Sequence, residues 1–172
     1  MMIKILLASF LGVSNVLADG AAIVDAISGI QNATAELSAT VASWNGGILG
    51  ALPIVSESTS LLTAINDATD TAKQSANLSD IEAVTVGLTI LSLVTDVNTS
   101  LTTIIDAKPK FDQVLLSGVV LLNLELEKGA STQFSDAVIE KLPATFVSTG
   151  ETLSGEITDS FDQAIDVYNG PF

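Results

Sequence analysis

Apolar side chains recur at alternating intervals of four and three residues through the first part of this 172-residue chain, which contains no cysteine. A helix with 3.6 residues per turn brings such positions onto one face. The clearest series comprises Ile23, Ile27, Ile30, Thr34, Leu37, Val41 and Trp44. Because no disulfide can stabilise the chain, these faces have to be buried against one another. The pattern therefore predicts an all-α protein whose stability comes from a packed apolar core.

The same periodicity predicts further helices along the rest of the chain. They cover residues 53–76, 79–106, 111–128, 131–142 and 148–168. Two of them begin with a capping-box signature, Ser79 with Glu82 and Ser148 with Glu151. The connections are short, which favours antiparallel neighbours. We expect an up-and-down bundle of five or six amphipathic helices without disulfides.

The segment 111–128 is apolar enough to form a strand by composition, but its length and flanks favour a helix. Gly129 follows Lys128 and is expected to end that helix. The core positions predicted on it are Val114, Leu115, Val119, Leu122 and Leu126.

Residues 1–18 have the features of a secretory signal peptide. Lys4 supplies the charged start, residues 5–13 form an apolar run, and residues 16–18 form a small-residue cleavage site. The apolar run is too short to span a bilayer, and no second long run follows it. We expect a signal peptide over residues 1–18 and one helical bundle domain over residues 19–172, secreted to the extracellular space.

Charge and composition narrow the class of function. Without Lys4 the chain has 5 lysines against 20 carboxylates, so nucleic acids and anionic membrane surfaces are unfavourable partners. The sequence has no histidine, cysteine or arginine, which removes serine–histidine catalysis, thiol nucleophiles and ordinary zinc sites. We expect no catalytic residues, no metal and no cofactor. Asp159, Asp162 and Asp166 share a helical face and leave a carboxylate-pair hydrolase open, although such a face is usually just solvated.

The helix predicted over residues 79–106 is apolar over about half its circumference, so it either touches several neighbours or lines a cavity. We predict ligand contacts on one side of it, at Val84, Leu88, Leu91, Val94, Asn98, Leu101 and Ile105. Asn98, with Thr95 or Thr102, would hold the polar head of an apolar ligand; the alternative is a residue at the edge of the apolar arc that carries a glycan. Thr34 and Ser58 interrupt apolar stripes and are expected to be small packing residues bonded to their own helix.

Three Asn-x-Ser/Thr sequons, at Asn32, Asn77 and Asn98, are the predicted glycosylation sites of a secreted chain.

Several of these features occur together in one known group. The signal peptide, the isoleucines at heptad spacing from Ile23, the Gly46-Gly47 break, the long Ala/Ser/Thr-rich helices and a last helix ending near Tyr168 resemble the fungal family of hydrophobic surface binding proteins and antigenic cell-wall galactomannoproteins. The resemblance implies a small secreted helical bundle, released or associated with the cell wall, and no catalytic residues. It implies binding of a long-chain fatty acid or another apolar small molecule in a pocket between helices. The alternative is a surface-active coat that adsorbs to hydrophobic surfaces and recruits secreted hydrolases. The sequence leaves open whether the bundle forms a homodimer.

Overall fold

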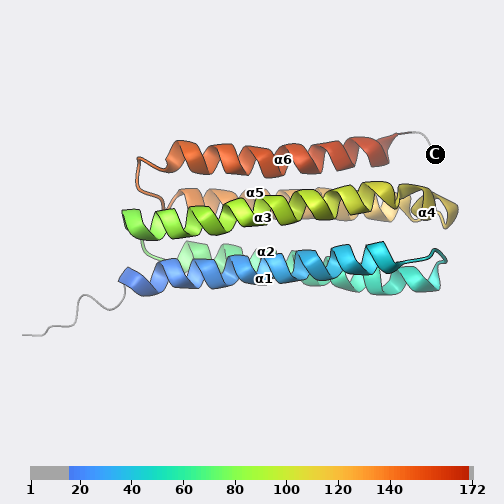
Figure 1. Ribbon diagram of the computed structural model, residues 1–172, viewed down its shortest axis with the longest axis horizontal. Coiled ribbons are helices and arrows are strands. Elements are labelled where there is room, and N and C mark those ends of the chain that lie inside the picture. The colour runs from blue at the N-terminus through green and yellow to red at the C-terminus, as the bar shows by residue number, and fades with distance from the viewer. Residues whose placement is uncertain (1–15, 171–172) are drawn as a thin grey trace, which may run out of the picture.

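The computed structural model describes residues 16–170, with side chains from residue 19, and every regular element in that part of the chain is helical (Figure 1). The elements are α1 (Val16–Ser43), the 3-10 turn η1 (Leu49–Ala51), α2 (Leu52–Gln74), α3 (Asp80–Asp106), α4 (Lys108–Gln113), α5 (Ser117–Ile139) and α6 (Val147–Asn169). The all-α prediction is confirmed. Residues 1–15, most of the predicted signal peptide, lie outside the described residues, so that assignment stays a prediction.

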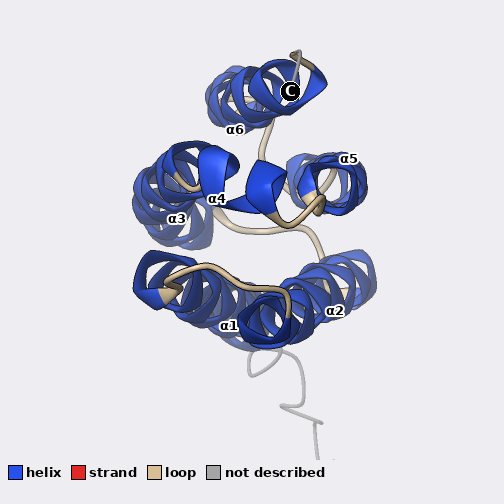
Figure 2. Cartoon of the chain, turned by 90° about the vertical axis from the view of Figure 1, so that its right-hand side faces the viewer, coloured by secondary structure: helices blue, strands red, loops and turns tan. Residues whose placement is uncertain are grey.

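The five long helices alternate in direction and close into a ring. α1 packs against α2 and α3, α2 against α5, α5 against α6, and α6 against α3. Seen from the end, α1 and α2 form one layer, α3 and α5 a second, and α6 a third (Figure 2). The up-and-down bundle is confirmed, but not every neighbour is antiparallel. α1 and α3 run the same way, since Gln31 bonds Asp96 and Ser38 bonds Thr103 further along both helices.

α1 is the element that the sequence describes best. All seven residues of its predicted stripe are buried, and Ile23 and Ile27 have no exposed surface. On α2 the predicted positions Ile54, Ser58, Leu61, Ile65, Ala68 and Ala72 are likewise buried. Each of these two helices buries only one face, so the apolar stripe in its sequence identifies the face that packs against the core.

The start of α3 is fixed by the predicted capping box, which is confirmed. The Glu82 backbone amide donates to Ser79 Oγ, and the Ser79 amide donates to Glu82 Oε2 at 2.9 Å. Glu82 Oε1 also accepts a hydrogen bond from the Gly20 amide of α1 at 3.2 Å. The Ser79 side chain and amide lower the pKa of Glu82, which favours the ionised form that accepts all these bonds. A Cβ at Gly20 would lie 2.8 Å from Glu82 Cβ, so glycine is what allows α1 to approach α3 here.

An aromatic cluster closes one end of the ring, where α4 crosses between α3 and α5 (Figure 2). Phe111 of α4 packs against Trp44 in a tilted arrangement, with ring centroids 4.5 Å apart and an interplanar angle of 37°, and meets the Tyr168 ring edge-on at 6.4 Å. The Tyr168 hydroxyl donates to the Ile104 carbonyl at 2.7 Å. All three rings are buried and form part of the core at this end of the bundle.

The predicted helix boundaries around residues 111–128 are wrong. The chain leaves the helical conformation after α4, because Leu115 takes a positive φ of 60°, and α5 then continues through Gly129 without a break. The predicted core face is wrong as well: Leu115, Val119, Leu122 and Leu126 are exposed, while Val114 is half-buried. The residues that α5 buries are Leu124, Glu127, Ala130, Phe134, Ala137 and Val138, together with Ser117.

The predicted capping box at Ser148 is also wrong, because α6 begins at Val147 after Phe146, with no side-chain cap. The predicted stripe on α6 is confirmed: Ile157, Phe161 and Tyr168 are buried, and Leu153 and Ile165 pack against the core.

Candidate ligand-binding cavity

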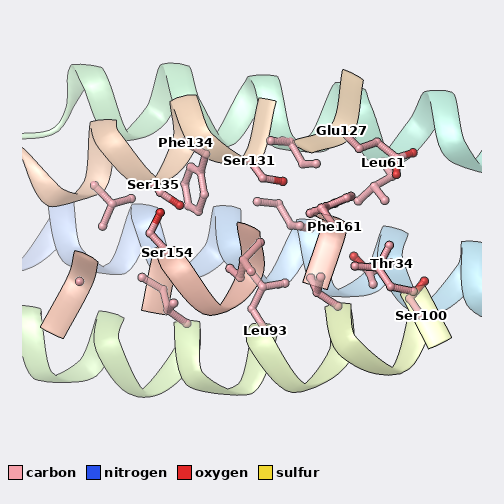
Figure 3. A pocket seen from close by; sticks show the side chains of 18 of the residues that line it. Thr34, Leu61, Leu93, Ser100, Glu127, Ser131, Phe134, Ser135, Ser154 and Phe161 are labelled. Carbon is pink, nitrogen blue, oxygen red and sulfur yellow. The ribbon is translucent and has the colours of Figure 1, made fainter. Parts of the chain in front are cut away.

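An elongated cavity runs along the centre of the ring, and all five long helices line it (Figure 3). α1 supplies Ile30, Thr34 and Leu37, α2 supplies Leu61 and Ile65, and α3 supplies Ile90, Leu93, Val97, Ser100, Leu101 and Ile104. α5 and α6 supply Glu127, Ser131, Phe134, Ser135, Val138, Ile139, Gly150, Ser154, Ile157 and Phe161, and Leu142 lies between them. The walls are therefore mainly aliphatic and aromatic, as expected of a site for an apolar ligand.

The cavity is long and narrow. The empty space between its walls is about 800 Å³ with its openings included, but only about 50 Å³ of it admits the centre of a water molecule. On α3 the wall runs from Ile90 to Ile104, which is about 21 Å at the rise of an α-helix. These dimensions suit an extended hydrocarbon chain better than a bulky ring system.

The hydroxyl groups of two serines that line the cavity face each other. Ser135 of α5 and Ser154 of α6 point toward one another in Figure 3, and both line the cavity. No histidine or arginine exists in the chain, and no lysine lines the cavity. A ligand carboxyl group at this pair, referred to below as the serine pair, would thus be held by hydroxyl donors and not by a cation.

Glu127 is the one ionisable side chain on the cavity wall. It is 3% exposed, and its Oε1 accepts a hydrogen bond from Ser58 Oγ at 2.6 Å. Burial raises the pKa of Glu127 to about 7, and the Ser58 bond offsets only part of that effect. Glu127 also lines a smaller neighbouring cavity, so this residue borders both spaces.

Both polar interruptions of the apolar stripes behave differently from what the sequence suggests. Ser58 bonds Glu127 on another helix instead of its own backbone. Thr34 Oγ1 is buried and has no hydrogen-bond partner among the described residues. Buried hydroxyl groups are normally paired, so an unpaired one on a cavity wall marks a place where a ligand group can bind.

The seven ligand contacts predicted on α3 are mostly misplaced. Leu101 lines the cavity; Val94 is buried but does not line it, and Ile105 is half-buried. Val84, Leu88 and Leu91 are exposed. The prediction chose the wrong part of a wide apolar arc, because the side of α3 that faces the cavity is decided by its contacts with α1 and α6.

Asn98 is exposed and does not line the cavity, which corrects its predicted role as the anchor of a polar head. Its Oδ1 accepts a hydrogen bond from Ser160 of α6. Thr95 and Thr102 donate to carbonyls of their own helix. The polar groups of the cavity that were not predicted as site residues are Ser100, Glu127, Ser131, Ser135 and Ser154. Small or polar residues on the inward face of a helix would have indicated these site residues. The inward face of α5, however, could not be identified from the sequence.

The remaining predicted features lie on the surface. Asn32 and Asn77 are exposed, as is Asn98, so the asparagine of each sequon is accessible. Asp159 and Asp166 are exposed, and Asp162 pairs with Lys128. Residues 16–170 contain no group of three or more acidic side chains arranged to hold a metal ion. Within the same range no helix combines the length and apolarity needed to cross a bilayer.

Fold and cavity together define a class: a ring of five helices around an elongated apolar cavity, which is the architecture of a helical binding protein for apolar ligands. The chain belongs to the family described as hydrophobic surface binding protein A, whose family model matches residues 20–140. Curated relatives are cell wall mannoprotein 1 of Aspergillus fumigatus, 30% identical over 84% of this chain, and of Aspergillus flavus, 27% identical over 87% of it. The chain spans about half the length of these relatives, 50% and 54% respectively.

Solved structures share the fold. AFMP4P in complex with palmitic acid superposes with a TM-score of 0.85 at 27% identity, covering 87% of this chain and 99% of that one. Ligand binding domain 2 of the Penicillium marneffei MP1 protein, complexed with multiple arachidonic acids, gives a TM-score of 0.83 at 22% identity and covers 88% of this chain and 96% of that one. At 22% identity, the similarity to this second structure supports the fold alone.

Proposed function

We propose that this protein binds a long-chain fatty acid along the axis of its bundle, with the acyl chain in the cavity and the carboxyl group at the serine pair. The observation that carries the proposal is the continuous apolar cavity that all five long helices line. The likeness to AFMP4P, whose structure contains palmitic acid, supports it. We infer a binding role and not a catalytic one, since the polar groups of the cavity are hydroxyls and a single carboxyl group.

The energetics favour such a ligand. Burying an acyl chain gains about 0.8 kcal/mol per methylene, so a long chain gains on the order of 10 kcal/mol. Association costs of roughly 4–15 kcal/mol have to be subtracted. The difference leaves room for useful affinity only if most of the chain is buried, which a cavity about 21 Å long allows.

The experiment is a titration of delipidated protein with palmitic acid, with lipid extraction and mass spectrometry of the protein as purified. Because charge-assisted hydrogen bonds are worth about 1.5–3 kcal/mol, replacing both Ser135 and Ser154 by alanine should weaken binding at least tenfold. Ser60→Ala is the matched control, since Ser60 is exposed and bonds the Ser56 carbonyl of its own helix. An equal affinity of the double variant and the control would refute the serine pair, and no binding by the parent protein would refute the function.

A second function is favoured by one observation. On one side of α3, four large apolar side chains spaced three or four residues apart are exposed: Ile81 at 78%, Val84 at 48%, Leu88 at 65% and Leu91 at 52%. Exposed apolar patches commonly mark contact surfaces, so adsorption to a hydrophobic surface is the alternative role. Replacing Ile81 and Leu88 by serine should then reduce depletion onto hydrophobic beads while fatty acid binding persists. Unchanged depletion would contradict a role of this face.

We also propose that the chain is secreted after cleavage behind residue 18, so that the working protein begins at Asp19. The packed core begins directly after that point, with Gly20 bonded to Glu82 and Ile23 fully buried. Mass spectrometry of the secreted protein should give Asp19 as the first residue, and treatment with an N-glycosidase should lower its mass if the exposed sequons carry glycans. Any other first residue, or an uncleaved chain, would contradict the proposal.

A further inference from the structure

Three buried polar groups line a stretch of the cavity away from the serine pair. Thr34 of α1, Ser100 of α3 and Glu127 of α5 are 3%, 4% and 3% exposed, and all border the same cavity. We call them the polar cluster. A cavity that holds only a hydrocarbon tail gains nothing from such groups, because buried polar atoms without partners destabilise the protein.

Thr34 gives the clearest indication that a partner is missing. Thr59 and Thr71, on the outside of α2, donate their hydroxyl protons to carbonyls four residues earlier. Thr34 Oγ1 makes no such bond and has no partner among the described residues. Glu127, in contrast, is fixed at the wall by the hydrogen bond from Ser58. The cluster thus combines a positioned carboxyl group with an unused hydroxyl group.

Contacts between neighbouring helices bring Thr34 and Ser100 to one level of the bundle. On α1 and α3, which run in the same direction, the pairs Gln31–Asp96 and Ser38–Thr103 lie on either side of them. Figure 3 shows both side chains, with Glu127, toward the same end of the cavity.

The serine pair lies further along the axis. Ser160 of α6 bonds Asn98 of α3, and these two helices are also parallel, so Ser154 lies near the level of Ser92. Ser92 precedes Ser100 by about two helical turns, or about 12 Å along the axis. The cavity therefore presents two polar stations that are separated by apolar wall.

We propose that the preferred ligand is a long-chain fatty acid with a hydroxyl group near the middle of its chain. Its carboxyl group would lie at the serine pair and its hydroxyl group at the polar cluster. An extended chain of carbon–carbon single bonds advances roughly 1.3 Å per bond, so about nine bonds span the two stations. A hydroxyl group fits the cluster because it donates one hydrogen bond and accepts others, as the mixture of Thr34, Ser100 and Glu127 requires. This inference rests on the proposed function.

The test compares the dissociation constants of stearic acid, 10-hydroxystearic acid and 2-hydroxystearic acid, measured by calorimetry on delipidated protein. The parent protein should bind the 10-hydroxy acid about tenfold more tightly than stearic acid. Stearic acid has no hydroxyl group on its chain, so it leaves the polar cluster without a hydrogen-bond partner, which lowers its affinity. The 2-hydroxy acid should show no such gain, because its hydroxyl group stays beside the carboxyl group. In Thr34→Val, which keeps the shape and removes the hydroxyl, the ratio of the two constants should fall to about one. Thr59→Val is the matched control and should keep the ratio of the parent.

The outcomes separate the two proposals. If stearic acid binds and the 10-hydroxy acid binds no more tightly, the inference is refuted and the proposed function stands. If the preference persists in Thr34→Val, the unpaired hydroxyl group of the polar cluster is not its source and the inference is refuted. If none of the three acids binds, the proposed function fails and the inference fails with it. Unfolding curves of each variant show whether it is folded before its ratio is interpreted.

Discussion

Glu127 makes the stability of the ligand-free protein fall as the pH rises, which is the reverse of what an ordinary ion-paired carboxylate does. Burial raises the pKa of Glu127 from 4.5 to about 7 in the folded protein. Between these values the folded state holds a proton that the unfolded state has lost. The stabilising effect of the neutral carboxyl group is complete below pH 4.5 and is lost as the pH rises through 7.

The size of the effect follows from the shift. One pKa unit corresponds to about 1.4 kcal/mol, so the full difference is about 3 kcal/mol, and about 2.5 kcal/mol of it falls between pH 5 and pH 8. That is a large part of the 5–15 kcal/mol by which a domain is usually stable. The figure is meaningful here because Glu127 is 3% exposed, and solvent screens the group little.

The assay is urea unfolding at half-unit pH steps, monitored by far-ultraviolet circular dichroism, for the parent protein and Glu127→Gln. Glutamine keeps an oxygen that can accept the Ser58 hydrogen bond but does not titrate. The other carboxylates contribute equally to both curves, so the difference between the curves isolates Glu127. This difference should change by about 2.5 kcal/mol from pH 5 to pH 8 in the direction that weakens the parent. Parallel curves over this range would refute the assignment.

Three further variants test the packing around the site, each by urea unfolding against the parent. Tyr168→Phe removes the buried hydrogen bond to the Ile104 carbonyl and should lower the free energy of unfolding by about 1 kcal/mol; an unchanged free energy of unfolding would contradict a stabilising role of this bond. Ser79→Ala removes the cap of α3 and should also cost about 1 kcal/mol, and an unchanged midpoint would contradict the capping box. Gly20→Ala forces a methyl group against Glu82 and should cost about 1–3 kcal/mol, whereas a stabilised variant would show that α1 and α3 are not so close.

The sequence predicts α1, α2 and the start of α3 well because each signal there has a single interpretation. The stripe from Ile23 to Trp44 carries nearly all of the large apolar residues of this segment, and polar or small residues lie between them, so periodicity alone gives the buried face. Ser79 and Glu82 form their two reciprocal bonds within four residues, so no distant contact decides them.

The sequence fails at α5 for an equally physical reason. Residues 114–126 are apolar in nearly every direction, so periodicity cannot select a face. The turn at Leu115 has no glycine to announce its positive φ, and Gly129 lies in an open position inside the helix, where it costs propensity but causes no break. Since α5 supplies Glu127, Ser131 and Ser135, an error in its face also hides half of the polar groups of the cavity.

The cavity follows from side chains that are too small to fill the centre of a ring of five helices. Close-packed interiors leave few voids, so the space on the axis persists only where inward positions are underfilled. At those positions the chain has Thr34, Ser100, Ser131, Ser135 and Ser154, where leucines would close the gap. All of these residues are polar as well as small, whereas alanine would have left the same space without an unpaired hydroxyl group. Their hydroxyls therefore argue for a ligand with polar groups at defined points along its chain, since a purely apolar occupant would leave them unpaired.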